Sequence, residues 1–134
     1  MLSNSSKVAI YMEGHLFTEN GKMGFGALRY LTNPIIAVID SNNSGKNIKD
    51  CLPINREVPI VKSIDDAISL GSEVLLLGIA NSGGLIPSLW FPVIDKAVSN
   101  GLSIINGLHD KLAQKYKNSL LDGQWIWDVR IPQF

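Results

Sequence analysis

The stretch that decides the fold is EVLLLGIANSGGLIP, residues 73–87. The apolar run after Glu73 lacks polar alternation, which is typical of a strand buried on both faces of a parallel sheet. Small residues follow at Gly78, Ala80, Ser82, Gly83 and Gly84, so the chain can turn there and a ligand can approach the backbone closely. Because open parallel sheets bind ligands at the carboxyl ends of their strands, the segment predicts both an architecture and the location of a site.

Outward from this stretch, apolar runs alternate with helical patterns along the whole chain. The predicted strands cover residues 8–12, 35–39, 58–61, 74–78, 102–105 and 125–129. Helices are predicted over residues 25–31, 63–70, 86–99 and 111–120, and polar turns over residues 41–57. This rhythm predicts right-handed crossovers and an α/β fold, with a mostly parallel sheet of about five to six strands and helices on both faces.

Length and charge narrow the class of protein. With 134 residues, the chain is expected to form a single domain over residues 1–134. Lys plus Arg and Asp plus Glu each number 12, so there is no net charge to attract nucleic acid or an anionic membrane. The longest apolar run is far shorter than the roughly 20 residues of a membrane span. A small-molecule ligand is therefore favoured over a polyanion.

Cysteine and histidine usage bears on compartment and metal chemistry. The single Cys51 allows no internal disulfide, which favours a reduced, cytoplasmic setting. Two histidines and one cysteine make a metal site unexpected. The last predicted strand runs almost to the final residue, which suits a domain cut from a longer chain as well as a natural stop.

Asp40 is the first candidate binding residue. It directly follows the strand at residues 35–39, where an acidic residue holds the ribose hydroxyls in dinucleotide-binding sheets. The loop after the first strand, however, does not contain the G-x-G-x-x-G motif of dinucleotide-binding domains. The alternative is that Asp40 orders the turn at residues 41–45.

The small residues after the central strand and His109 are the other candidates. Gly78, Ala80, Gly83 and Gly84 either admit a ligand to the backbone or only allow tight strand-to-helix packing. His109 follows the strand at residues 102–105, at the same sheet edge, and could act as an acid or base. The alternative is that Asp110 caps the next helix and His109 is its structural neighbour.

The tryptophans and one charged pair concern packing and partners. Trp90 is expected to face the core or a subunit, and Trp125 and Trp127 suit an interaction module that packs on a second domain or subunit. Asp128 and Arg130 either form an ion pair at a strand end or shape a junction to a following domain.

The chain resembles the N-terminal domain of the DgcN-like family over about residues 7–132. Each motif is short, but their order and spacing are specific. They are ALRY at 27–30, IAVID at 36–40, GK at 45–46, VPIV at 58–61, LGIA at 77–80, GG at 83–84, GLH at 107–109 and DVRIP at 128–132.

The resemblance implies a Rossmann-like N-terminal domain followed in full-length members by a P-loop domain, which this chain lacks. Some members are described as D-glutamate N-acetyltransferases, so it implies acetyl-CoA or a nucleotide as cofactor. We accordingly expect a ligand-binding or accessory domain that is not catalytically complete alone. The alternatives are an NAD-binding oxidoreductase or epimerase domain, and a non-catalytic module for interdomain contact or homo-oligomerisation.

Overall fold

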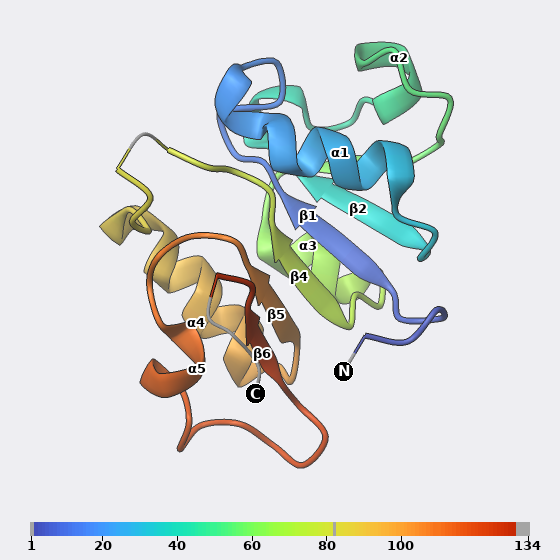
Figure 1. The fold of residues 1–134 in the computed structure, drawn as a ribbon. Helices are drawn as coiled ribbons and strands as arrows, with labels where there is room; N and C mark the ends of the chain where they lie inside the picture. Colours follow the sequence, from blue (N-terminus) through green and yellow to red (C-terminus); the bar gives the residue numbers. More distant parts are fainter. Residues whose placement is uncertain (1, 82, 131–134) are drawn as a thin grey trace.

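The computed structural model describes residues 2–81 and 83–130, which form one sheet with helices on both faces (Figure 1). Six strands pair in the order β3-β2-β1-β4-β5-β6, and every pairing is parallel. This is the doubly wound order in which the chain first moves outward in one direction from β1 and then in the other from β4. The predicted α/β, Rossmann-like class is confirmed, with six strands.

Strands and helices follow one another in the expected sequence. The first half contains β1 (Val8–Tyr11), η1 (Glu19–Gly21), α1 (Lys22–Tyr30), β2 (Ile35–Ile39), η2 (Ser41–Asn43), α2 (Ile48–Cys51) and β3 (Ile60–Val61). The second half contains α3 (Ile64–Ser69), β4 (Val74–Leu77), η3 (Ser88–Trp90), α4 (Phe91–Ser99), β5 (Ser103–Asn106), α5 (Leu112–Lys115) and β6 (Ile126–Asp128). No helix among the described residues is long and apolar enough to cross a membrane.

Each face of the sheet has its own apolar core. On one face, side chains such as Leu75, Leu77 and Ile104 pack with residues of α3, α4 and α5. On the other, Ile10, Val38 and their neighbours pack beneath α1, which lies in front of β1 and β2 in Figure 1. β4 is fully buried on both sides, as its apolar sequence predicted.

Several predictions of helices and turns differ from the structure. Helix α1 begins at Lys22 rather than at residue 25, because the 3-10 turn η1 leads directly into it. Residues 41–57 are not only turns, since η2 and α2 form there and Asn47 caps α2 by accepting from the Lys49 amide. The predicted helix at residues 111–120 is only four residues long, because residues 117–119 are exposed and polar and have no apolar face to bury.

The helix predicted at residues 86–99 is divided. Pro87 has an extended backbone, η3 makes one tight turn, and α4 begins at Phe91. Pro92 stands in the first turn of α4, where its missing N–H costs no helical hydrogen bond. Trp90 ends η3 as a core residue with 8% of its surface exposed, which confirms the core-facing alternative and removes it as an exposed docking residue.

Candidate functional site

The carboxyl ends of all six strands lie at one edge of the sheet, because every pairing is parallel. The connections from β1 and β4 diverge there, so the edge has the switch point at which open α/β sheets bind ligands. We call the loops after β1, β2 and β3 the first half of this edge, and the loops after β4, β5 and β6 the second half.

Asp40 lies in the first half and is 1% exposed. Its carboxylate accepts hydrogen bonds from the Gly14 amide at 3.1 Å and from Asn43 Nδ2 at 2.7 Å. Its carbonyl accepts from the Asn43 amide at 3.1 Å. Asp40 therefore joins the loop after β1 to the turn after β2, which is the ordering role considered as the alternative to ribose binding.

Gly78 directly follows β4 and lies against Gly24 of α1. Its carbonyl accepts a hydrogen bond from the Gly24 amide at 3.0 Å. A Cβ added at Gly78 would lie 2.7 Å from Ile10 Cγ2 and 3.0 Å from Gly24 Cα. Two facing glycines therefore let the backbones of α1 and β4 meet, which is a packing role.

Gly84 and His109 are brought together in the second half. The His109 amide donates to the Gly84 carbonyl at 2.7 Å, and a Cβ on Gly84 would overlap the His109 ring. Gly84 also has a φ of +71°, a conformation that glycine adopts readily. His109 is exposed, so its ring packs on a loop and faces solvent.

The other predicted residues of this loop have separate environments. The Ala80 amide donates to the Asn20 carbonyl at 2.8 Å, which attaches the loop to η1. Gly83 is exposed, and an added Cβ would meet nothing within 4 Å. Ser82 lies outside the described residues, as do residues 131 and 132 of the last family motif. Asp40 belongs to the other half of the edge, with β1 between β2 and β4.

A buried polar network fixes the second half. Asn106 and Asp128 are 0% and 3% exposed, and Asn106 Nδ2 donates to the Asp128 carboxylate at 2.9 Å. Asp128 also accepts from the amides of Leu112 and Ala113 at 3.2 and 3.0 Å, so it caps the start of α5. The helix is therefore capped from β6 and not by Asp110, whose carboxylate accepts from the Ile86 amide at 2.6 Å.

The ion pair considered for Asp128 and Arg130 is wrong. Among the described residues, salt bridges join only Lys22 to Glu19, Lys49 to Glu57 and Lys96 to Asp65. Arg130 Nε instead donates to the Gly107 carbonyl at 2.6 Å. The two side chains serve different partners because Asp128 is directed to the N-terminus of α5.

The first half of the edge holds a cavity of about 270 Å³, which we call the β1–β3 edge pocket. Its polar lining is Tyr11, Glu13, Ser41, Lys62 and Ser63. Sequence reasoning missed these residues because it followed glycines. Each lies at the end of a strand or within two residues of one, so examining the residues after every strand would have found them.

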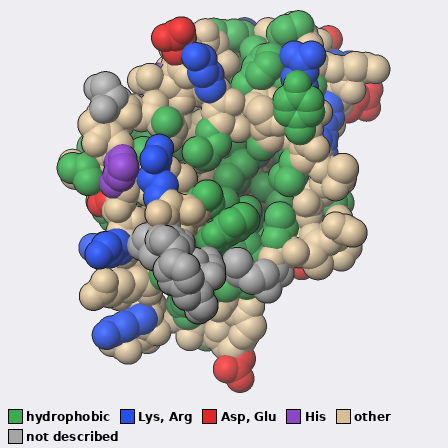
Figure 2. All heavy atoms as spheres, in the orientation of Figure 1, with side chains coloured by type: hydrophobic (Ala, Val, Ile, Leu, Met, Phe, Trp, Pro, Cys, Tyr) green, Lys and Arg blue, Asp and Glu red, His purple; other side chains and the backbone are tan. Residues whose placement is uncertain are grey.

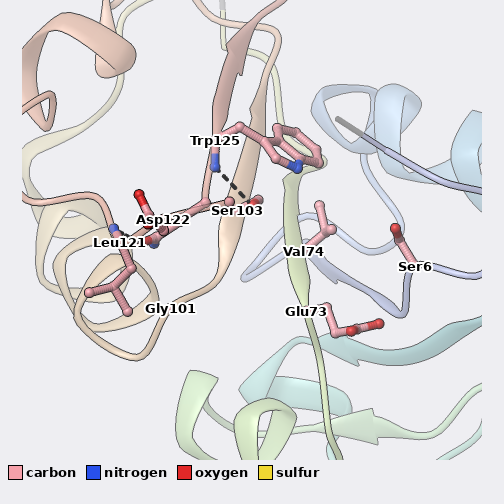
Figure 3. A pocket seen from close by; sticks show the side chains of 10 residues that line it. Ser6, Glu73, Val74, Gly101, Ser103, Leu121, Asp122 and Trp125 are labelled. Atoms are coloured by element: carbon pink, nitrogen blue, oxygen red, sulfur yellow. Dashed lines mark hydrogen bonds between the residues drawn. The ribbon is translucent and has the colours of Figure 1, made fainter.

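Two further cavities lie elsewhere. One of about 330 Å³ is at the amino ends of β4 and β5, where Trp125, Val74 and Ser103 surround it, and the Trp125 amide donates to Ser103 Oγ at 3.1 Å (Figure 3). Another of about 410 Å³ lies beside η1, between Phe17 and Leu52. The first is at the opposite edge from the predicted site residues, so it does not combine with them.

The doubly wound sheet and its carboxyl edge define a Rossmann-like domain. Residues 41–132 match the family described as a domain of unknown function, DUF1611_N, Rossmann-like domain. The match covers more than half of the chain, and the chain belongs to this family. A crystal structure of a DUF1611 family protein from Anabaena variabilis has a TM-score of 0.91 and 40% identity, covering 96% of this chain and 38% of that one.

Two curated relatives carry a functional name. A D-glutamate N-acetyltransferase from Pseudoalteromonas sp is 44% identical over an alignment of 69 positions that covers 45% of this chain and 21% of the relative. A D-glutamate N-acetyltransferase from Tritonibacter scottomollicae is 30% identical over an alignment of 73 positions that covers 52% of this chain and 22% of the relative. The aligned part of the chain thus spans about a fifth of the length of these relatives.

Proposed function

We propose that this chain is the N-terminal ligand-binding or accessory domain of an acetyl-CoA-dependent N-acetyltransferase for an amino acid such as D-glutamate. The observation that carries the proposal is the 44% identity with a protein of that name. Since only about a fifth of that relative is matched, the domain is proposed to be catalytically incomplete alone. A P-loop domain would supply the remaining machinery.

The site chemistry is compatible with this role. The carboxyl edge offers the polar β1–β3 edge pocket in one half and the exposed His109 in the other. Of the residues predicted from the sequence, Gly83 and His109 are the proposed contacts for a cofactor such as acetyl-CoA or a nucleotide, whereas Asp40, Gly78, Ala80 and Gly84 are held by contacts within the protein. Within this set, Gly83 and His109 are the exposed members and are the ones a ligand would reach first.

The NAD-binding alternative draws on the same strand order, but two features weigh against it. The chain has no G-x-G-x-x-G fingerprint after β1. Asp40, the residue that would hold ribose hydroxyls, is 1% exposed and already accepts from Gly14 and Asn43. The Asp40 carboxylate therefore has almost no exposed surface at which a ribose could bind.

The test is a thermal-shift titration of the chain with acetyl-CoA, CoA, NAD, ATP and D-glutamate. A ligand at about 100 times its dissociation constant stabilises the folded state by about 2.7 kcal/mol, which raises the melting temperature by several degrees. We expect a shift with acetyl-CoA or D-glutamate and none with NAD. A saturable NAD shift that Asp40→Ala abolishes would replace the proposal with the alternative.

The same preparation tests completeness. We expect no acetylated D-glutamate when the chain alone is incubated with acetyl-CoA and D-glutamate, and product formation by a full-length relative assayed in parallel. Turnover by the chain alone would overturn the accessory role while keeping the acetyltransferase assignment.

A second role, contact with the P-loop domain, is favoured by one observation. Trp125 and Trp127 are half-buried on the α1 face of the sheet, and apolar side chains gather in the centre of this face (Figure 2). Adding the separated P-loop domain of a relative should shift the tryptophan emission of this chain to the blue. Replacing Trp125 and Trp127 by Leu should remove that shift, whereas the buried Trp90 would remain as an internal control.

A further inference from the structure

The β1–β3 edge pocket is lined by Tyr11, a side chain with a hydroxyl that can act as a donor. Tyr11 is 5% exposed, and its ring packs edge-on against Trp90 with centroids 5.6 Å apart. No group within residues 2–81 and 83–130 forms a hydrogen bond with the Tyr11 hydroxyl, which nevertheless belongs to a side chain that lines the pocket. Because this side chain lines the pocket, a molecule bound there can accept a hydrogen bond from the hydroxyl.

The Tyr11 hydroxyl is prepared to donate. Burial, together with the negative charge of Glu13, raises its pKa to about 12. The phenol therefore keeps its proton at neutral pH and can donate a hydrogen bond to an anionic or carbonyl oxygen. This makes Tyr11 a contact for an acceptor group of a ligand.

Two opposite charges accompany this donor. The Glu13 carboxylate is held in place by the Ser41 amide at 2.8 Å and by the Ser41 hydroxyl. Lys62 is exposed at the end of β3 and takes no part in the salt bridges of the described residues. The pocket thus has a fixed anion and an available cation among its lining residues.

The rest of the lining limits size and class. Ile39, Ile64 and Val93 supply apolar surface. A cavity of about 270 Å³ is at the lower end of the range for small-molecule sites, which suits a ligand of amino-acid size. A polyphosphate would bring several negative charges close to Glu13, which opposes its binding.

We propose that the β1–β3 edge pocket binds a small zwitterionic amino acid through its charged groups. The Glu13 carboxylate would accept hydrogen bonds from the ammonium group of the ligand. Lys62 and the Tyr11 hydroxyl would donate hydrogen bonds to its carboxylate. The choice of D-glutamate as the first probe rests on the proposed function, whereas the chemical class rests on the lining of the pocket.

The experiment is calorimetric titration of the chain with D-glutamate, with glutarate as a matched probe that lacks the ammonium group. We expect saturable binding of D-glutamate and about tenfold weaker binding of glutarate, because the contact with Glu13 is lost. Lys62→Gln and Tyr11→Phe should each weaken D-glutamate binding about five- to tenfold. Lys46→Gln, which changes another exposed lysine outside the pocket lining, should bind like the original chain.

Thermal unfolding of each variant separates loss of binding from loss of fold. A folded Lys62→Gln or Tyr11→Phe variant that binds D-glutamate as well as the original chain would overturn the pocket assignment. Such a result would leave the proposed function intact as long as a full-length relative acetylates D-glutamate in the parallel assay. If D-glutamate does not bind, alanine, glycine and aspartate are titrated under the same conditions.

Binding of one of these amino acids with the same sensitivity to Lys62→Gln would support the pocket and remove D-glutamate from the proposed function. Absence of binding by every amino acid tested would overturn the pocket. Binding of ATP or CoA that depends on Lys62 would also overturn it, since the occupant would then be a nucleotide rather than a zwitterion.

Discussion

The two halves of the carboxyl edge are built differently. In the first half, Tyr11, Glu13 and Lys62 line a cavity, and Lys62 is exposed beside it. In the second half, Asn106 and Asp128 join β5, β6 and α5 through buried hydrogen bonds, and Gly84 packs directly on His109. One half leaves polar groups available, whereas the other uses them to hold its loops together.

This difference shows that small residues at a strand end do not by themselves indicate a ligand. Gly78 and Gly84 are in close contact with Gly24 and His109, so each glycine makes space that the protein itself fills. The cavity lies instead where larger side chains leave space between them. The following changes test whether the two halves are separate, starting with the largest expected effect.

Replacing Asp128 by Ala should cause the largest loss of stability, about 3 kcal/mol, because the buried amides of Leu112 and Ala113 lose their acceptor. The free energy of unfolding in urea measures this loss. Asp122→Ala, which changes an exposed acid on the preceding loop, should cost less than about 0.5 kcal/mol. Equal losses for both variants would contradict the anchoring role of Asp128.

Gly78→Ala should destabilise by about 2–3 kcal/mol, because the new Cβ would push α1 away from β4. Gly26→Ala, in the helix α1 that packs on Gly78, is its matched control. An added Cβ there meets nothing within 4 Å, so the better helix propensity of alanine should stabilise the protein by about 0.5–1 kcal/mol. A neutral Gly78→Ala variant with weaker ligand binding would instead assign Gly78 to a ligand.

Alkaline pH should weaken the protein partly through Tyr11, whose pKa is raised to about 12 from 10.0. Between these values the unfolded chain loses the proton and the folded chain keeps it, so the free energy of unfolding falls as pH rises, by up to about 2 kcal/mol. Urea unfolding at about pH 9 and about pH 11.5 measures the fall. Tyr11→Phe should make this fall in the free energy of unfolding smaller. An unchanged fall would show that another group titrates, such as Tyr116, whose pKa is also raised by burial and by Asp95.

Gly83→Ala should have the smallest effect on stability, within about 0.5 kcal/mol, because the added methyl group enters open space. Gly84→Ala on the same loop should cost clearly more, since its positive φ and the His109 ring both oppose a side chain. The comparison also separates packing from binding. Weaker acetyl-CoA binding in a fully stable Gly83→Ala variant would show that a ligand reaches this backbone.

Most of the fold could be predicted from local patterns. The run at Val74–Leu77 indicated a doubly buried strand, and the helix predicted over residues 63–70 forms as α3, where Ser63 accepts from the Asp66 amide. Such signals are local, because the spacing of apolar residues and the capping of a helix each involve only a few neighbouring residues. The cap of α5 was not predictable in this way, since its N-terminus is capped by Asp128, which lies 16 residues from Leu112.

The candidate site was predictable only in its location. The sequence alone determined that the strands alternate with helices and that ligand chemistry belongs at their carboxyl ends, because hydrophobic period and turn residues are properties of neighbouring positions. Only the tertiary structure decided that Tyr11, Glu13 and Lys62 share a cavity and that Gly84 meets His109. Those pairings join residues far apart in the chain, so they arise from strand order and packing rather than from any local pattern.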